Sequence, residues 1–259
     1  MVKGLYTAYT GMINEQNRMD IMTNNLANAS TVGYKKEGST SQSFDDVLTV
    51  KIKDQSVGMR NVQRLGVKNP GVKIGENYTD YSQGSFRITG NTYDLALSGE
   101  GFFAIEFTNK AGETDTKYTR AGQFTLNKDG YLVTEEGDYV LDTQNRRIRL
   151  NTLIDSSITD DGTIYQNGQA VAKIQVTDFE DYDYLEKYGE TYYQPIQGAK
   201  TIAAKAQVKS GYLEMANVQI VSEMVNLISI TRAYESNQKV VQTIDDTLDV
   251  AVTQIGRVQ

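Results

Sequence analysis

The chain has 259 residues, of which 23% are charged and 39% apolar, and its net charge of −7 argues against nucleic acid as a partner. It contains no Cys, His or Trp, which excludes thiol nucleophiles, Ser-His-Asp triads and the usual zinc sites. Carboxylates remain, so composition leaves a hard-metal or Asp/Glu hydrolase site open, but no motif indicates a cofactor. No apolar run approaches the roughly 20 residues of a membrane span, so we expect no membrane insertion.

The first predicted element is an amphipathic helix from about residue 3 to residue 28. Its apolar positions step by three and four residues, with only Glu15 out of pattern, and such spacing places one face of a helix against a partner. The helix is expected to end before Gly33, where Asn and Ser favour turns. The apolar positions are Leu5, Ala8, Met12, Met19, Met22, Leu26 and Ala29.

Residues 34–71 are mostly polar and are expected to form a linker or extension, with a turn at Pro70-Gly71. Its few apolar residues, which begin at Phe44, fit either a short helix or a short strand. Residues 72–210 predict an antiparallel β domain, because turn-type glycines recur between short apolar runs. One of these runs, residues 101–107, is expected to form a strand. Hairpins are expected around residues 127–130 and around Asn167-Gly168, a dipeptide that favours a type I′ turn.

The last predicted element is a second amphipathic helix, from about Asn217 to Ile255. Its expected stripe is interrupted by Thr231, Gln238 and Asp245. At about 1.5 Å per residue this helix would exceed the first by roughly 20 Å, which leaves a part of it without an intramolecular helical partner. The expected stripe is Ile220, Met224, Leu227, Tyr234, Val241, Leu248, Val252 and Ile255.

The predicted fold class is therefore α+β, with the N- and C-terminal helices paired as a coiled-coil-like domain and a central antiparallel β domain. The expected domains are residues 1–33 with 211–259 as a terminal helical assembly domain, 34–71 as the linker, and 72–210 as the β domain. The alternative is that both helices fold back onto the β domain as a lid.

Ordered blocks along the whole chain resemble the bacterial flagellar rod, hook and hook-associated axial family. The N-terminal blocks are NRMDIMTNNLANA at 17–29 and TVGYK at 31–35, and the C-terminal blocks are GYLEMANV at 211–218 and RAYESN at 232–237. The central blocks YDLALSGEGFF at 93–103 and YTRAGQF at 118–124 are similar to those of rod proteins of this size. The resemblance does not distinguish the distal from the proximal rod type.

This resemblance implies a structural subunit of the flagellar rod, not an enzyme, located in the basal body outside the cytoplasmic membrane. Its implied partners are itself as a helical homopolymer, other rod and hook proteins, and the flagellar export apparatus. Export without a cleaved signal peptide fits the N-terminus, where Thr10, Asn14, Glu15 and Gln16 interrupt any apolar signal segment.

Polar residues in the helices are also candidates for the assembly interface. Asn24, Asn25 and Asn28 could hydrogen-bond to a neighbouring helix or subunit and fix its register, or could merely end the helix. Arg232 lies beside Tyr234, and the stripe position of Tyr234 makes burial the expectation for Tyr234 more than for Arg232.

Two other functions compete with the rod subunit. The first is an Asp/Glu-based hydrolase of cell-wall glycan, which needs two carboxylates facing one cleft. The second is a β-domain binding protein whose helices form a dimerising stalk. The acidic, Tyr-rich segment 178–186 fits a carbohydrate or Ca²⁺ site, or an exposed loop between strands.

Overall fold

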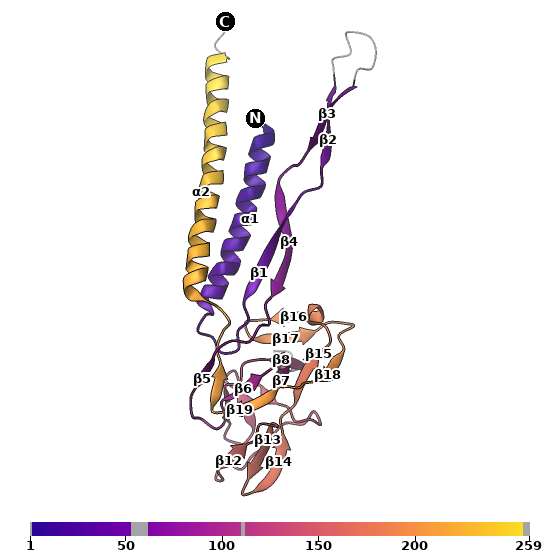
Figure 1. The fold of residues 1–259 in the computed structure, drawn as a ribbon, viewed down its shortest axis with the longest axis vertical. Helices are drawn as coiled ribbons and strands as arrows, with labels where there is room; N and C mark the ends of the chain where they lie inside the picture. The colour runs from indigo at the N-terminus through magenta and orange to yellow at the C-terminus, as the bar shows by residue number, and fades with distance from the viewer. Residues whose placement is uncertain (1, 53–61, 110–111, 256–259) are drawn as a thin grey trace. The chain divides into compact units, whose positions relative to one another are not determined.

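The structure is a computed structural model that describes residues 2–52, 62–109 and 112–255 (Figure 1). Its helices are α1 (Val2–Ala27) and α2 (Ile220–Val250), with a short 3₁₀ helix η1 (Tyr182–Tyr184) and a π-helical turn η2 (Ala251–Ile255) that continues α2. The strands are β1 (Glu37–Ser43), β2 (Val47–Ile52), β3 (Val62–Lys68), β4 (Val72–Thr79), β5 (Phe86–Ile88), β6 (Leu95–Ser98), β7 (Phe102–Thr108), β8 (Thr114–Thr119), β9 (Phe124–Leu126), β10 (Leu132–Thr134), β11 (Tyr139–Val140), β12 (Ser156–Ile158), β13 (Thr163–Gln166), β14 (Gln169–Lys173), β15 (Val176–Phe179), β16 (Leu185–Tyr188), β17 (Tyr192–Pro195), β18 (Thr201–Ala203), β19 (Gln207–Ser210) and β20 (Tyr212–Glu214).

The chain forms two compact units. The first, here called the helical unit, comprises residues 1–26, 37–80 and 220–259; the second, here called the β domain, comprises residues 27–36 and 81–219. These bounds differ from the expected ones at the linker and at both ends of the β domain. The difference arises because residues 37–80 pair with one another beside α1, whereas residues 27–36 and 211–219 are bound to the β domain.

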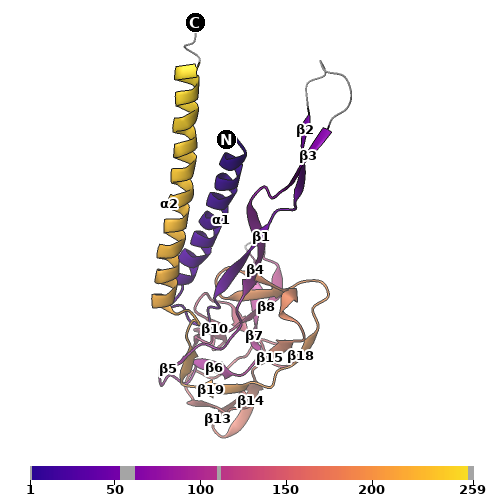
Figure 2. The same cartoon turned by 45° about the horizontal axis from the view of Figure 1, so that its top comes forward.

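Within the helical unit, α1 lies between α2 and the β1–β4 ribbon, as both views show (Figures 1 and 2). The helices are antiparallel, and two glycines of α1 face α2. A methyl group at Gly4 would lie 3.6 Å from Cδ1 of Ile244, and one at Gly11 would lie 3.0 Å from Nδ2 of Asn237. Both pairs are seven residues apart, so the two helices contact each other with heptad spacing.

The inward face of α2 agrees with the predicted stripe at only half of its positions. Its least exposed residues step by four and three, and this stripe includes Ile230, Asn237 and Ile244 where Thr231, Gln238 and Asp245 were expected; Thr231, beside the stripe, is also partly buried. The inward face of α2 is therefore mostly apolar, and its charged or amide residues are Glu223 and Asn237. The positions are Glu223, Leu227, Ile230, Tyr234, Asn237, Val241, Ile244, Leu248 and Ala251.

The segment expected as a polar linker contains three strands. β1 pairs with β4 in antiparallel register, from Glu37 opposite Thr79 to Ser43 opposite Val72, with an irregularity at Ser39–Ser41. β2 pairs with β3 as a separate two-stranded ribbon. The cross-strand bonds satisfy backbone groups of these strands, which the polar composition of the segment did not indicate.

In the β domain, the main sheet has the order β16-β17-β8-β7-β11-β10-β9, and β15 pairs with β7 and β18. Smaller sheets are formed by β12-β13-β14, β19-β6 and β20-β5. All the named strand pairs are antiparallel. The α+β class, with a helix at each end and a central antiparallel domain, is thus confirmed.

The strand β7 lies between two apolar cores. Phe103 belongs to one core, with Leu95, Leu97 and Phe124, and Phe102 belongs to the other, with Tyr118, Phe179 and Tyr193 among its members. Successive side chains of a strand point to opposite faces, so a continuous apolar run indicates burial on both faces. The predicted strand at residues 101–107 therefore becomes the centre of the domain.

Both predicted hairpins are present. β9 pairs with β10 across residues 127–130, and β13 pairs with β14 across Asn167-Gly168. Asn167 has φ 53° and Gly168 has φ 79°, as a type I′ turn requires of its two central residues.

Candidate assembly surface and anchoring cluster

An apolar face is exposed at the start of α2, and we call it the α2 face. Its members are Ile220, Val221, Met224, Val225 and Ile228, with exposed fractions from 45% for Ile220 to 77% for Val221. Their spacing places them on one side of the helix. Contiguous apolar surface of this kind marks sites of protein–protein contact more often than isolated exposed side chains do.

A second apolar group lies on α1. Tyr6, Tyr9 and Ile13 are exposed by 40% or more and step by three and four residues. They continue into the exposed positions Gln16, Asp20 and Thr23, so the apolar character is confined to the N-terminal half of this stripe.

The C-terminal helix is also longer than its partner. Since α2 and η2 extend from Ile220 to Ile255 and α1 only from Val2 to Ala27, the difference is about 15 Å. Val250 and Val252, near the end of the C-terminal helix, are exposed. The length mismatch is thus somewhat smaller than the sequence suggested.

The structure separates the expected interface residues into two groups. Those of α1 and the second half of the α2 stripe are at least partly buried in the single chain: Leu5, Met12, Met19, Met22, Leu26, Leu227, Tyr234, Val241 and Leu248. Ile220, Met224, Arg232 and Val252 are exposed, so Tyr234 is indeed more buried than Arg232. The side chain of Ile255 lies outside the described residues.

The asparagines near the end of α1 bind within the chain. Asn25 is fully buried and forms two hydrogen bonds with the backbone of Glu37, which donates its N–H to Oδ1 at 2.9 Å and accepts from Nδ2 at 2.7 Å. Asn28 donates to Glu190 at 2.8 Å, and Asn24 is partly buried. The side chain of Asn25 therefore hydrogen-bonds the backbone of the first residue of β1 in the way that a neighbouring strand would. From the sequence, we expected either a contact with a neighbouring helix or subunit or a helix end, and not this role.

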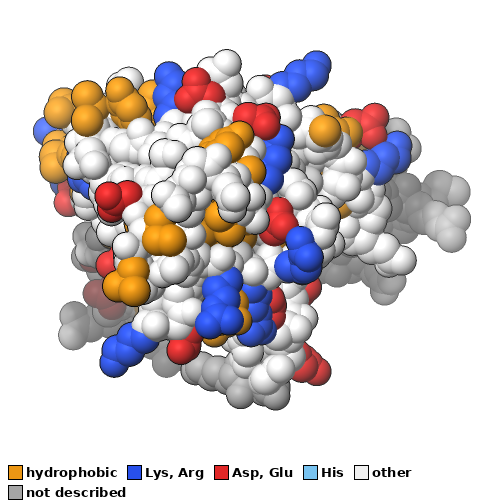
Figure 3. All heavy atoms as spheres, turned by 90° about the horizontal axis from the view of Figure 1, so that it is seen from below, with side chains coloured by type: hydrophobic (Ala, Val, Ile, Leu, Met, Phe, Trp, Pro, Cys, Tyr) orange, Lys and Arg blue, Asp and Glu red, His pale blue; other side chains and the backbone are white. Residues whose placement is uncertain are grey.

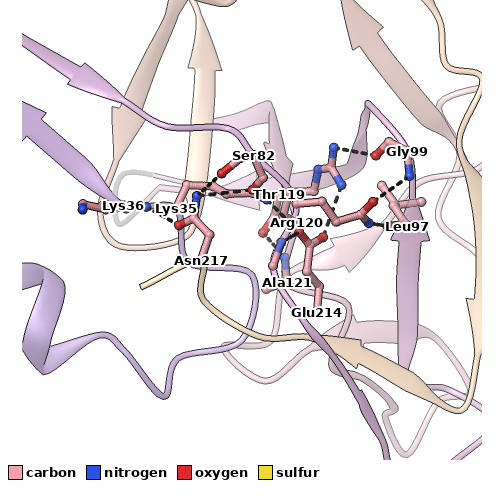
Figure 4. Close-up of polar contacts among 12 residues, drawn as sticks. Lys35, Lys36, Ser82, Leu97, Gly99, Thr119, Arg120, Ala121, Glu214 and Asn217 are labelled. Carbon is pink, nitrogen blue, oxygen red and sulfur yellow. Dashed lines mark hydrogen bonds and ion pairs between the residues drawn. The ribbon is translucent and has the colours of Figure 1, made fainter. Parts of the chain in front are cut away.

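A buried ionic cluster joins three distant segments of the β domain (Figure 4). The carboxylate of Glu214, on β20, accepts from Lys35 Nζ at 2.7 Å and from Arg120 Nη1 at 3.2 Å. Side-chain exposure is 1% for Glu214 and Lys35 and 3% for Arg120. Breaking such a buried pair is costly because the remaining charge is desolvated.

Backbone groups complete the ionic cluster. Lys35 also donates to Ser82 O at 2.7 Å, Arg120 to Gly99 O at 2.8 Å, and Gly84 N donates to Glu214 at 3.0 Å. Neither Glu214 nor Lys35 stood out in the sequence, because Lys35 and Glu214 are 179 residues apart and no local pattern links them. Each did lie inside a block that carries the family resemblance.

Beside the ionic cluster, Asn217 binds the backbone of two other segments of the β domain. Its Oδ1 accepts from Lys36 N at 2.7 Å, and its Nδ2 donates to Ser82 O at 3.2 Å. The second helix was expected to start at about Asn217, but α2 begins at Ile220. Its side chain therefore ties residues 35–36 to residue 82 (Figure 4).

The acidic segment 178–186 uses its carboxylates for local structure. Asp178 accepts from Phe179 N and from the Tyr182 hydroxyl, and Asp181 caps η1 by accepting from Asp183 N. Burial, followed by the hydrogen bond to Asp178, raises the pKa of the Tyr182 hydroxyl. These contacts fit a loop between strands.

The described parts of the chain contain neither a metal-ligand cluster nor a helix suited to span a membrane. Within residues 2–52, 62–109 and 112–255, Asp and Glu nowhere gather in a group of three suited to a metal ion. Over the same residues, neither helix is both long and apolar enough to cross a membrane.

Comparisons with known proteins match the chain in three regions. Residues 5–35 match the model of the flagella basal body rod protein, residues 96–168 the D1 domain of the flagellar hook protein FlgE/F/G, and residues 209–254 the C-terminal region of flagellar basal body rod FlgEFG proteins. The flagellar basal-body rod protein FlgG of Bacillus subtilis is 34% identical over 97% of this chain and 98% of its own length. The chain belongs to the flagellar basal-body rod protein family.

Other members of the family are comparably similar. FlgF of Caulobacter vibrioides is 32% identical over the full length of both chains, and FlhO of Bacillus subtilis, a flagellar hook-basal body complex protein, is 30% identical over the same extent. The protein is thus a structural subunit of the basal-body rod and not an enzyme. As a rod protein, it assembles with other rod and hook components.

Proposed function

We propose that this rod subunit polymerises with copies of itself through its two helices, and that the polymer transmits torque towards the hook. The observation that carries the proposal is the α2 face, where five apolar side chains are exposed on one side of a helix. Fully burying a Val, Ile or Met side chain contributes roughly 1.5–3 kcal/mol, so a neighbouring subunit that covers the α2 face gains substantial free energy.

The exposed group Tyr6, Tyr9 and Ile13 and the overhanging end of α2 supply further contacts of the same kind. In this arrangement the partly buried stripes hold the helix pair together, and the exposed ones bind neighbours. Delivery through the flagellar export apparatus without a cleaved signal peptide is part of the proposal and rests on the family alone.

The test places two charges on the α2 face in the full-length protein. Val221→Asp with Val225→Asp should abolish concentration-dependent assembly in sedimentation velocity, because two carboxylates would have to be desolvated in the contact. The matched control is Ser222→Asp with Asn226→Asp, which adds the same charges to exposed positions on another side of the same turns and should assemble normally.

Normal assembly of the first variant would overturn the proposal, as would a wild-type chain that stays monomeric at every concentration. A fixed small oligomer in place of a growing polymer would instead favour the binding protein with a dimerising stalk. The hydrolase alternative has no support from the family, whose members are structural.

A further inference from the structure

The two segments that connect the β domain to the helices enter the domain side by side. Val32 forms an antiparallel bridge with Met215, and Gly33 N donates to Glu214 O at 2.8 Å. One segment is residues 27–36 and the other is residues 211–219. The first and the last residues of the β domain in chain order therefore lie next to each other.

The ionic cluster lies where these segments meet. Glu214 from the C-terminal segment binds Lys35 from the N-terminal segment and Arg120 from the body of the domain (Figure 4). The bonds of Lys35 to Ser82 O and of Arg120 to Gly99 O are made to neutral oxygens and do not neutralise a charge. The carboxylate of Glu214 thus bridges two buried cations, Lys35 and Arg120.

The same end of the chain also supplies strands. β19 pairs with β6 and β20 pairs with β5, and Val208 of β19 belongs to the core that contains Phe103. Before residues 207–214 are present, two strands lack their partners and Arg120 lacks its carboxylate. Desolvating an uncompensated guanidinium costs a large share of the free energy that typically stabilises a domain.

We propose that Glu214 is the closing residue of the β domain, without whose charge the domain does not hold its folded state. Folding of residues 81–206 is then coupled to the arrival of the C-terminal segment. The biological meaning of this coupling rests on the proposed function. In a rod subunit delivered unfolded, the β domain would stay unfolded until residues 207–214 had joined it.

The test uses full-length Glu214→Gln, which keeps the shape of the side chain and removes its charge. Hydrogen exchange measured by mass spectrometry on peptides that cover β6 and β7 should show at least about a hundredfold loss of protection, since the buried guanidinium of Arg120 loses its carboxylate partner. Peptides from α2 serve as an internal comparison in the same experiment.

The matched control is Glu106→Gln. Glu106 binds Arg147 at 2.6 Å, as short as the pair in the ionic cluster, but this pair is exposed to solvent. Loss of an exposed pair should reduce protection by about fivefold at most. Together the two variants separate burial of the carboxylate from the mere presence of a Glu–Arg bond.

A rescue variant shows whether charge is the cause. Lys35→Met, Arg120→Met and Glu214→Leu together replace the three charges by apolar groups of similar length, and should recover most of the lost protection. Retained protection in Glu214→Gln would overturn the proposal, and so would a triple variant that is as unprotected as the single one. Neither result would bear on polymerisation, which the α2-face variants test separately by sedimentation.

Discussion

The β domain and the helical unit differ in how far their apolar side chains are exposed to solvent. In β7 four consecutive residues, from Phe102 to Ile105, are almost completely removed from solvent. In α2, which is more than four times as long, the buried residues within the described chain are Glu223 and Ile230. The β domain completes its own core, whereas the helices leave apolar surface for other molecules.

This contrast supports the proposed division of roles, in which the β domain provides a stable core and the helices provide the assembly surface. Figure 3 shows the molecule from below in the view of Figure 1, where acidic, basic and apolar side chains are all scattered over a largely uncharged surface. A mixed surface of this kind favours solubility. The α2 face has the opposite composition, so substitutions in the two regions should have different consequences.

The strongest challenge to this comparison is Phe103→Ala. Phe103 is fully buried and packs edge-to-face on Phe124 at 5.2 Å, so its truncation should lower the free energy of unfolding of the β domain by about 3–5 kcal/mol. Urea unfolding followed by circular dichroism measures this loss. Val221→Ala, at the exposed α2 face, should change the same quantity by about 0.5 kcal/mol at most. Similar losses in the two variants would refute the division of roles.

A smaller effect is expected from Asn25→Ala in the helical unit. Its two bonds to the partly buried backbone of Glu37 are lost, at a cost of about 2 kcal/mol. Hydrogen exchange of β1 peptides should report the change. Asn17→Ala is the control, because Asn17 bonds only to Ile13 O of its own helix. If β1 exchange is unaltered in Asn25→Ala, the helix end is not held by this side chain.

Gly168→Ala tests a turn of the β domain. Its φ of 79° is unfavourable for a residue with a side chain, although a methyl group would meet nothing within 4 Å. The cost should therefore be conformational only and about 1 kcal/mol, visible in urea unfolding. Gly168→Asn should cost less, since Asn tolerates this conformation better than Ala. An equal loss of stability in both variants would mean that the positive φ of this turn is not the cause of the loss.

The smallest effect concerns pH. The hydrogen bond from Arg147 holds the pKa of the Glu106 carboxyl below its usual range. A depressed folded-state pKa contributes stability above the unfolded value of 4.5 that is lost as pH falls through the folded value. Glu106→Gln should thus be destabilised by about 1 kcal/mol or less at pH 7, and the difference from wild type should shrink at about pH 3. A constant difference across this range would exclude the ion pair as its cause.

The features that sequence predicted are those encoded by neighbouring residues. Asn167-Gly168 indicated its turn because both residues tolerate positive φ, and residues 101–107 indicated a strand because β7 is apolar on both faces. The helical repeat was also local. The predicted stripe on α2 was wrong at every second position, because it contained Met224 and Val252, which are exposed, and omitted Ile230 and Ile244, which face inward. All four residues are apolar, so sequence alone does not show which of them face the partner helix.

The features that sequence did not predict depend on residues far apart in the chain. Glu214 meets Lys35 across 179 residues and Arg120 across 94 residues, and no periodicity records such a meeting. The polar composition of residues 37–43 concealed β1, whose partner β4 begins only at Val72. The buried amide of Asn25 belonged to a block with a family resemblance, but its acceptor and donor, both on Glu37, are backbone atoms that sequence does not display.

The two glycines of α1 have a further consequence for the helix pair. Because Gly4 and Gly11 are seven residues apart, as are Ile244 and Asn237, sliding α1 along α2 by one heptad would place Gly11 opposite Ile244. Such a slide covers about 10.5 Å, and intermediate positions would bring larger side chains between the helices. The polar Asn237, seated against Gly11, distinguishes the observed register from the shifted one, as a single buried polar residue does in coiled coils. Alignments of the helix pair that keep a glycine against α2 are therefore spaced one heptad apart, and the position of Asn237 differs between them.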